Sequence, residues 1–323
     1  MKAFALFLSL AGIFLLTGCG NNSEEAHFRR FEQLLFSAQP EGKDLYSVLK
    51  ENESNYRFLF NYPLEDSIYI EDLKNFSSDT ILREINDTVQ KYYGDLSWLE
   101  KDMAKAVGNV KEHFPEFELS YFYTLIHADF DYFNRVLVVD SFLALSIDMY
   151  AVPYFQKYGF FGLPRYMANM LTKEEILPDC VSAIGRSLLE DSEDSKSLLE
   201  IMILRGKILY FMDKVIPNVS DHLKIRYNLE QFKWCEKNEA LIWSYLMEKQ
   251  LLYKTNFFEI RHLVNEGPAT QGFEGAPARL GEYIGWQIVK KYMSKNSVSL
   301  PELFANTDAQ KILSSSGYKP KRK

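Results

Sequence analysis

The sequence predicts an α+β fold that is mainly helical, with a small antiparallel sheet and one helix buried at its centre. Most of the chain has apolar residues at helical spacing, whereas residues 117–126 and 135–146 are runs of aromatic and β-branched side chains typical of strands. Residues 197–215 are apolar on nearly every side, as expected for a helix that other elements surround.

Four stretches before the predicted strands show helical spacing: residues 26–36, 43–52, 80–92 and 96–113. After the strands, the chain is again expected to be mainly helical. Thr172 with Glu175 has the spacing of a capping box, as does Asn228 with Gln231, so a helix should begin at each pair. Pro178 is suited to the first turn of a helix, where its missing N–H is tolerated.

The N-terminus has the features of a secretory signal. Lys2 precedes the apolar run 3–16, which is shorter than the ~20 residues that a membrane span needs. Leu16-Thr17-Gly18-Cys19 resembles the lipobox of bacterial lipoproteins, in which the cysteine receives lipid and becomes the new N-terminus. We therefore expect cleavage before Cys19 and attachment to a membrane through lipid on that residue.

The chain after the signal peptide (residues 1–18) is expected to form one domain. Residues 19–25 are a short polar tether, and no linker rich in Pro, Gly or Ser interrupts residues 26–310. Residues 311–323 are expected to be a basic tail, and its last five residues, 319–323, are expected to be disordered. Cys180 and Cys235 lie in apolar helical contexts, so we expect buried free thiols, with a single disulfide as the alternative.

Composition and motifs exclude several classes of function. The formal net charge of −7 argues against nucleic acid as a partner. The sequence contains neither a Gly-x-Ser-x-Gly motif nor a glycine loop of the Walker or dinucleotide-binding type, so we expect no cofactor. The five histidines are too far apart for two of them to share a helical face, as the HExxH zinc site requires. We therefore predict no metal site and no enzyme activity.

Five segments of the chain resemble, in order and over about residues 26–295, the gliding-motility lipoprotein GldB family of Bacteroidetes: residues 143–150, 177–179, 206–210, 234–243 and 281–289. The resemblance implies an outer-membrane-associated lipoprotein with a zinc-peptidase-like domain that lacks the metal ligands. Arg205 stands where the family usually carries Glu, and an arginine cannot bind zinc. The resemblance therefore implies a degenerate peptidase cleft.

The candidate cleft residues are Asp148, Arg205, Lys207, Tyr210, Glu239, Arg279 and Glu282. Glu239 falls on the apolar stripe of a predicted helix over 228–250, so its carboxylate must be paired or neutral. We expect it to form a buried ion pair with Arg205, Lys207 or Arg279, with a functional site as the alternative. Asp148 is expected to cap a turn rather than bind an ion.

Glycine positions indicate how the cleft is bordered. The segment 264–277 is the longest loop rich in Gly and Pro, and it is expected to lie at the edge of the cleft as a ligand or partner surface. Gly281 and Gly285 are four residues apart on a predicted helix, which indicates that another helix packs closely there.

The leading hypothesis is a non-catalytic lipoprotein that serves as an interaction or scaffold component of outer-membrane gliding or protein-export machinery. Its expected partners are the membrane, through lipid on Cys19, and proteins of the cell envelope, with the periplasmic face as the expected location. Two alternatives remain open. One is a lipoprotein that binds a peptide in the cleft beside residues 264–277, and the other is an unusual hydrolase that uses Glu239, Glu282 and Tyr210.

Overall fold

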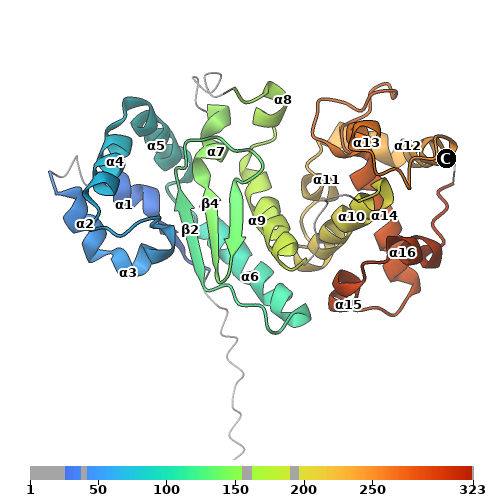
Figure 1. Cartoon of the computed structure of the whole chain (residues 1–323), viewed down its shortest axis with the longest axis horizontal. Coiled ribbons are helices and arrows are strands. Elements are labelled where there is room, and N and C mark those ends of the chain that lie inside the picture. Colours follow the sequence, from blue (N-terminus) through green and yellow to red (C-terminus); the bar gives the residue numbers. More distant parts are fainter. Residues whose placement is uncertain (1–25, 38–41, 155–161, 190–195, 322–323) are drawn as a thin grey trace, which may run out of the picture.

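The computed structural model of the protein describes residues 26–37, 42–154, 162–189 and 196–321. It is mainly helical with one small sheet, which confirms the predicted fold class. Figure 1 shows the sheet in the middle of the molecule, with the earliest helices on one side and the C-terminal helices on the other. The predicted signal peptide, Cys19 and the tether lie outside the described residues.

The sheet contains these strands in chain order: β1 (Phe28–Arg30), β2 (Tyr121–Leu125), β3 (Val136–Val139) and β4 (Phe142–Ser146). Their spatial order is β1-β2-β4-β3. The β1–β2 and β2–β4 pairs are parallel and β3–β4 is antiparallel, so the sheet is mixed and the predicted antiparallel arrangement was wrong. The run 135–146 turns back at Asp140, whose φ of 47° allows a tight turn, and thereby forms a hairpin.

Helices fill the chain between β1 and β2: α1 (Phe31–Ser37), α2 (Leu45–Glu51), α3 (Glu53–Tyr56), the 3-10 helix η1 (Arg57–Leu59), α4 (Ser67–Ser78), α5 (Thr80–Tyr93) and α6 (Ser97–His113). The first helix starts later than predicted, because residues 28–30 pair with β2. α4 was not predicted, although Asp66 is a strong start signal. Its carboxylate accepts hydrogen bonds from the N–H groups of Ile68 and Tyr69.

The chain after β4 is helical: α7 (Ile147–Ala151), the 3-10 helix η2 (Val152–Tyr154), α8 (Arg165–Ala168), α9 (Lys173–Ser187), α10 (Leu198–Val215), α11 (Asp221–Lys224), α12 (Leu229–Glu248), α13 (Phe257–Val264), α14 (Leu280–Lys295), α15 (Leu300–Ala305) and α16 (Ala309–Ser316). Pro178 lies inside α9, so its predicted place in a first turn was wrong. Thr172 is the N-cap but makes no capping hydrogen bond with its side chain. The capping box of Asn228 and Gln231 is confirmed.

α10 is the buried central helix that the sequence predicted, and it packs closely against α14. A side chain at Gly206 would overlap the backbone of Gly285, and one at Gly285 would overlap the carbonyl of Met202. Glycine at both positions therefore lets the two helix backbones touch. The predicted close packing at Gly281 and Gly285 is confirmed, since a Cβ at Gly281 would also come within 3.0 Å of a backbone carbonyl, that of Leu263 in α13.

Cys180 and Cys235 are buried free thiols, as predicted. At the C-terminus, α16 crosses residue 310, and the ring of Tyr318 packs edge-on against Trp243 with 5.1 Å between centroids. The boundary expected between the domain and a tail therefore falls inside a helix, because Ile312 and Tyr318 supply apolar surface to the core. Across the described ranges, no helix combines the length and apolar character that a membrane span requires.

Candidate functional site

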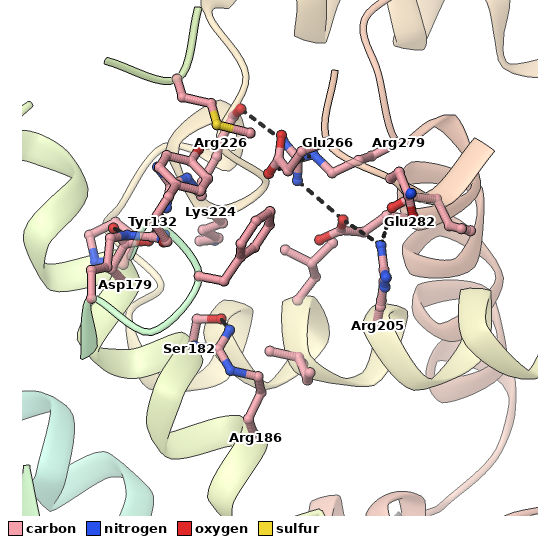
Figure 2. Close-up of a pocket in the computed structure, with 18 of the residues that line it drawn as sticks. Tyr132, Asp179, Ser182, Arg186, Arg205, Lys224, Arg226, Glu266, Arg279 and Glu282 are labelled. Atoms are coloured by element: carbon pink, nitrogen blue, oxygen red, sulfur yellow. Dashed lines mark hydrogen bonds and ion pairs between the residues drawn. The ribbon is translucent and has the colours of Figure 1, made fainter. Parts of the chain in front are cut away.

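A cavity of about 560 Å³ opens between α9, α10 and the start of α14, and its rim includes residues 132–135 and 264–266. Figure 2 shows Arg205 on α10 beside Glu282 on α14, with Ser182 and Arg186 on α9 across from them. A cavity of this size matches the ~300–1,000 Å³ typical of small-molecule sites. Polar side chains from distant parts of the sequence meet there, so it is the candidate functional site.

Asp179 on α9 organises one wall of the cavity. Its carboxylate accepts hydrogen bonds from Arg135 Nε at 2.7 Å, Arg135 Nη2 at 2.5 Å, Tyr150 Oη at 2.6 Å and Arg226 Nη1 at 2.8 Å. Asp179 is buried, and the side chains of both arginines are about nine-tenths buried. Two guanidinium groups therefore share one carboxylate, so among the described residues one positive charge stays uncompensated in a region of low polarity.

Arg226 keeps two donors unused at this wall. Its Nε and Nη2 atoms are buried and have no hydrogen-bond partner within the part of the chain that the structure describes. Its guanidinium carbon lies 4.9 Å from the centre of the Tyr132 ring, and that of Arg135 lies 4.8 Å from the same ring, so Tyr132 stabilises both cations through cation–π contacts. The φ of Arg226 is 58°, a left-handed conformation that is strained for a residue with a Cβ.

Glu175 lies one turn before Asp179 on α9 but does not neutralise the arginines. Desolvation, together with repulsion from Asp179, raises its pKa to about 9. The side chain is therefore protonated and uncharged at neutral pH, and its Oε2 atom has no partner in the described part of the chain. The capping box predicted for Thr172 and Glu175 is therefore absent.

Arg279 forms the opposite wall at the N-cap of α14. Its guanidinium donates to Glu282 Oε2 at 3.1 Å and lies 3.2 Å from Glu266 Oε1. The Nη2 atom also donates to the carbonyls of Ile225 at 2.9 Å and Arg226 at 3.0 Å. Arg279 thus ties α14 to the segment after α11, and its own φ of 59° is a second left-handed backbone at the site.

Two more arginines complete the lining. Arg205 donates to the carbonyl of Val264 and lies 3.9 Å from Glu282 Oε2. Arg186 is exposed and donates to Ser182 Oγ at 2.9 Å, and within the described ranges it has no carboxylate partner. Partial desolvation and the nearby positive charge of Arg135 lower its pKa. Both side chains therefore add positive charge to the open part of the cavity.

The cavity is positively charged although the whole chain is acidic. Five arginines line it with the carboxylates of Asp179, Glu266 and Glu282. Lys224 also borders it, but its ammonium group pairs with Asp213 and Asp221 at 2.8 and 3.0 Å. Without that lysine the described residues of the lining carry two more positive than negative charges, so their electrostatic field favours an anionic ligand.

The structure brings only some of the predicted cleft residues together. Arg205, Arg279 and Glu282 line the cavity, and the predicted loop reaches its rim through residues 264–266. Asp148 does not line it. Its Oδ2 atom accepts a hydrogen bond from the N–H of Ala128 at 3.0 Å and holds the loop after β2, in line with the expected capping role. Desolvation raises the pKa of Asp148 to about 6.

Lys207 and Tyr210 also lie away from the cavity. Lys207 is buried on another side of α10, where its Nζ atom donates to the carbonyl of Asn306 at 2.6 Å and thereby fastens the end of α15. The ring of Tyr210 contacts the ammonium group of Lys214 at 5.2 Å. Neighbouring residues on one helix thus point to different faces, which the shared segment 205–210 did not reveal.

The predicted ion pair of Glu239 is wrong. Its Oε1 atom accepts a hydrogen bond from the hydroxyl of Tyr318 at 2.9 Å, and it lines a separate pocket beside α16. The helical stripe correctly indicated that the carboxylate needs a partner. That partner is an uncharged side chain close to the C-terminus, in the stretch that was expected to be a basic tail outside the domain.

Sequence reasoning missed Arg135, Asp179 and Arg226. Asp179 follows Pro178, a residue that indicates backbone geometry rather than a charged site. Arg135 precedes a strand and Arg226 follows a short helix, so no periodic pattern marked either residue. The available signal was the charge of Asp179 inside a segment rich in buried positions, because a buried charge requires a partner.

A family model described as gliding motility protein GldB matches residues 20–320. No curated protein and no solved structure matches the chain. The likeness to zinc peptidases therefore stays a prediction. The family match spans the sheet, all the helices that line the cavity and the C-terminal α16. Because it covers nearly the whole sequence, the chain belongs to the GldB family of gliding motility proteins.

Proposed function

We propose that this protein is a non-catalytic lipoprotein, anchored through Cys19, that serves as an interaction component of gliding or protein-export machinery at the outer membrane. Membership of a gliding motility family supports a role in that machinery. The signal and lipobox of the first residues support a lipid anchor, which would hold the helical domain close to a membrane surface.

The arginine-rich lining of the cavity is the observation that carries the non-catalytic part of the proposal. A guanidinium group stays protonated at physiological pH, so it is neither a metal ligand nor a general base. The two buried carboxylates of α9 are also unsuited to catalysis, since Asp179 is held by three donor residues and Glu175 is not among the residues that line the cavity. The chemistry of this lining favours recognition of a negatively charged group.

The hydrolase alternative has less support. Its residues Glu239, Glu282 and Tyr210 do not converge, because Glu282 lines the arginine cavity, Glu239 lines the pocket beside Tyr318, and Tyr210 lines neither of these two. A nucleophile or base must lie within hydrogen-bond reach of the group that it activates. Stoichiometric bound metal together with a hydrolytic activity that Glu282→Gln abolishes would overturn the non-catalytic proposal.

A crosslinked pull-down from the protein's own cells tests the interaction role. The full-length chain is compared with the Cys19→Ser variant, which lacks the acylation site but keeps the whole helical domain. We expect the native chain to recover outer-membrane motility or secretion proteins that the variant does not recover. Recovery of the same proteins by both chains would contradict the need for the anchor, and recovery of no specific protein would contradict the interaction role.

A further inference from the structure

The charges of the cavity are less well balanced than those of the ion cluster beside it. Next to it, Lys224 and Lys290 are matched by Asp213 and Asp221, and that cluster joins the same helices without leaving net charge. In the cavity, Arg186 has no carboxylate partner in the described part of the chain, and Arg226 has two unused donors there. Since uncompensated buried charge destabilises a protein, this excess indicates that a ligand supplies the missing anion.

The donors suit an oxyanion in particular. In a guanidinium group, Nε–H and the neighbouring Nη–H point the same way and can bind two oxygens of one carboxylate or phosphate. The unused donors of Arg226 are these two atoms, Nε and Nη2. Arg186 and Arg205 face the cavity from α9 and α10, so an anion between them would be approached from two sides, as Figure 2 shows.

The remaining walls indicate that the ligand also has an apolar part. The cavity of about 560 Å³ is several times larger than a single carboxylate or phosphate needs. Apolar and aromatic side chains occupy the space between the arginines: Tyr132, Phe133, Met167, Ile208, Leu209 and Val264. Phe133 is 65% exposed, which makes its ring available for contact with a ligand.

We propose that this cavity binds an oxyanion, a carboxylate or a phosphate, carried on an apolar body, with the anionic group held between Arg186, Arg205 and Arg226. This inference deepens the proposed function and rests on it, because it names the chemistry by which an envelope partner or ligand would be recognised. The apolar body would lie against Phe133 and the exposed side of Ile208.

Thermal unfolding of the full-length chain in detergent tests the proposal with small probes at matched ionic strength. The probes are 3-phenylpropionate, its neutral amide 3-phenylpropanamide, phenyl phosphate and inorganic phosphate. We expect a saturable rise in Tm of roughly 2–5 °C at tenfold excess over Kd for at least one of the two anionic phenyl probes. The carboxylate and phosphate probes distinguish the two anions, since the one that matches the site will saturate at lower concentration.

Matched variants separate the site from general charge effects. Arg186→Gln should remove at least half of the ligand-dependent shift without loss of folding, because this side chain is exposed and makes one hydrogen bond to Ser182. Arg261→Gln makes the same change in charge at an exposed position outside the cavity and should keep the full shift. The proposal would be overturned if the neutral amide raised Tm as much as 3-phenylpropionate does. It would also be overturned if inorganic phosphate raised Tm as much as phenyl phosphate does.

The outcome is independent of the pull-down. If the native chain recovers its envelope partners but no anionic probe shifts Tm, the cavity assignment is wrong and the interaction role stands. If the probes bind through Arg186 but no partner is recovered, the cavity assignment stands and the interaction role is wrong.

Discussion

Two ion clusters lie side by side near α11, and they differ in how their charges balance. In the first, Lys224 and Lys290 face Asp213 and Asp221, and the indole N–H of Trp286 donates to Asp213 at 2.9 Å. Each cation there has a carboxylate partner. In the second, Arg135 and Arg226 share the one carboxylate of Asp179 within the described ranges, because the neighbouring Glu175 is protonated at neutral pH.

This difference in charge balance distinguishes a cluster with a purely structural role from one that suits a binding site. A balanced cluster joins helices with little net cost, since each desolvated charge has a partner. The unbalanced cluster faces the cavity, leaves the Nε and Nη2 atoms of Arg226 without partners in the described part of the chain, and keeps two residues in left-handed backbone conformations nearby. Strain and excess charge at one place are typical of a binding site.

The largest expected effect comes from removing the shared carboxylate. Asp179→Asn would leave Arg135 and Arg226 buried with no counter-charge, so we expect the free energy of unfolding to fall by about 3–5 kcal/mol. Equilibrium unfolding in urea measures this change. The matched change in the balanced cluster is Asp221→Asn, where Lys224 keeps Asp213 as its partner. A loss for Asp221→Asn as large as that for Asp179→Asn would contradict the difference between the clusters.

Glu175→Gln should alter how stability depends on pH. The pKa of Glu175 is about 9 in the folded chain against an ordinary value of 4.5, so the folded state binds the proton more tightly and wild-type stability falls as pH rises between these values. Glutamine cannot ionise, and the variant should gain up to about 2.7 kcal/mol relative to wild type between about pH 6 and pH 8. Asp148, whose pKa is about 6, is present in both chains and cancels in the difference. Parallel pH curves would show that Glu175 is ionised in the fold.

Tyr150→Phe tests how much the hydroxyl of Tyr150 stabilises the Asp179 wall. The variant removes the hydroxyl that donates to Asp179 at 2.6 Å but leaves the ring in the core. Loss of one buried hydrogen bond to a charged group should lower the free energy of unfolding by about 1–2 kcal/mol, as measured in urea. Tyr93→Phe, which removes a buried hydrogen bond to the carbonyl of Tyr150 instead, is the control and should have the smaller effect.

The smallest expected effect on stability is that of Arg186→Gln. This arginine is exposed and has one hydrogen bond, so the free energy of unfolding should change by less than about 0.5 kcal/mol without ligand. The direction should be towards higher stability, because desolvation and repulsion from Arg135 disfavour the charge of Arg186. Equilibrium unfolding of Arg186→Gln in urea, with Arg261→Gln as the charge-matched control, checks this expectation. A clear loss of stability would mean that Arg186 holds the fold rather than the ligand.

Elements with local signals were predictable from the sequence. α10 is apolar on nearly all sides and is therefore recognisable as a buried helix. The glycines at 281 and 285 predicted a close contact, and it occurs with α10. The sheet was harder, because whether β1 and β2 pair in parallel depends on a partner far along the chain rather than on any local pattern.

The candidate site was predictable only in part, for the same physical reason. Arg205, Arg279 and Glu282 were expected in one cleft and line one cavity. The Asp179 wall joins residues 135, 179 and 226, which no spacing rule connects. Glu239 is a second example. Its place on the apolar stripe of a helix indicated burial, but the stripe could not identify Tyr318 as the hydrogen-bond partner.

The contact between Gly206 and Gly285 has a consequence for recognition. Arg205 immediately precedes the first glycine, and Glu282 lies one turn before the second, so the backbone contact fixes how the Arg205–Glu282 pair is placed on one side of the cavity. A pair whose helix backbones are held in contact is preorganised, and a ligand that binds beside it loses little affinity to reorganisation of the protein.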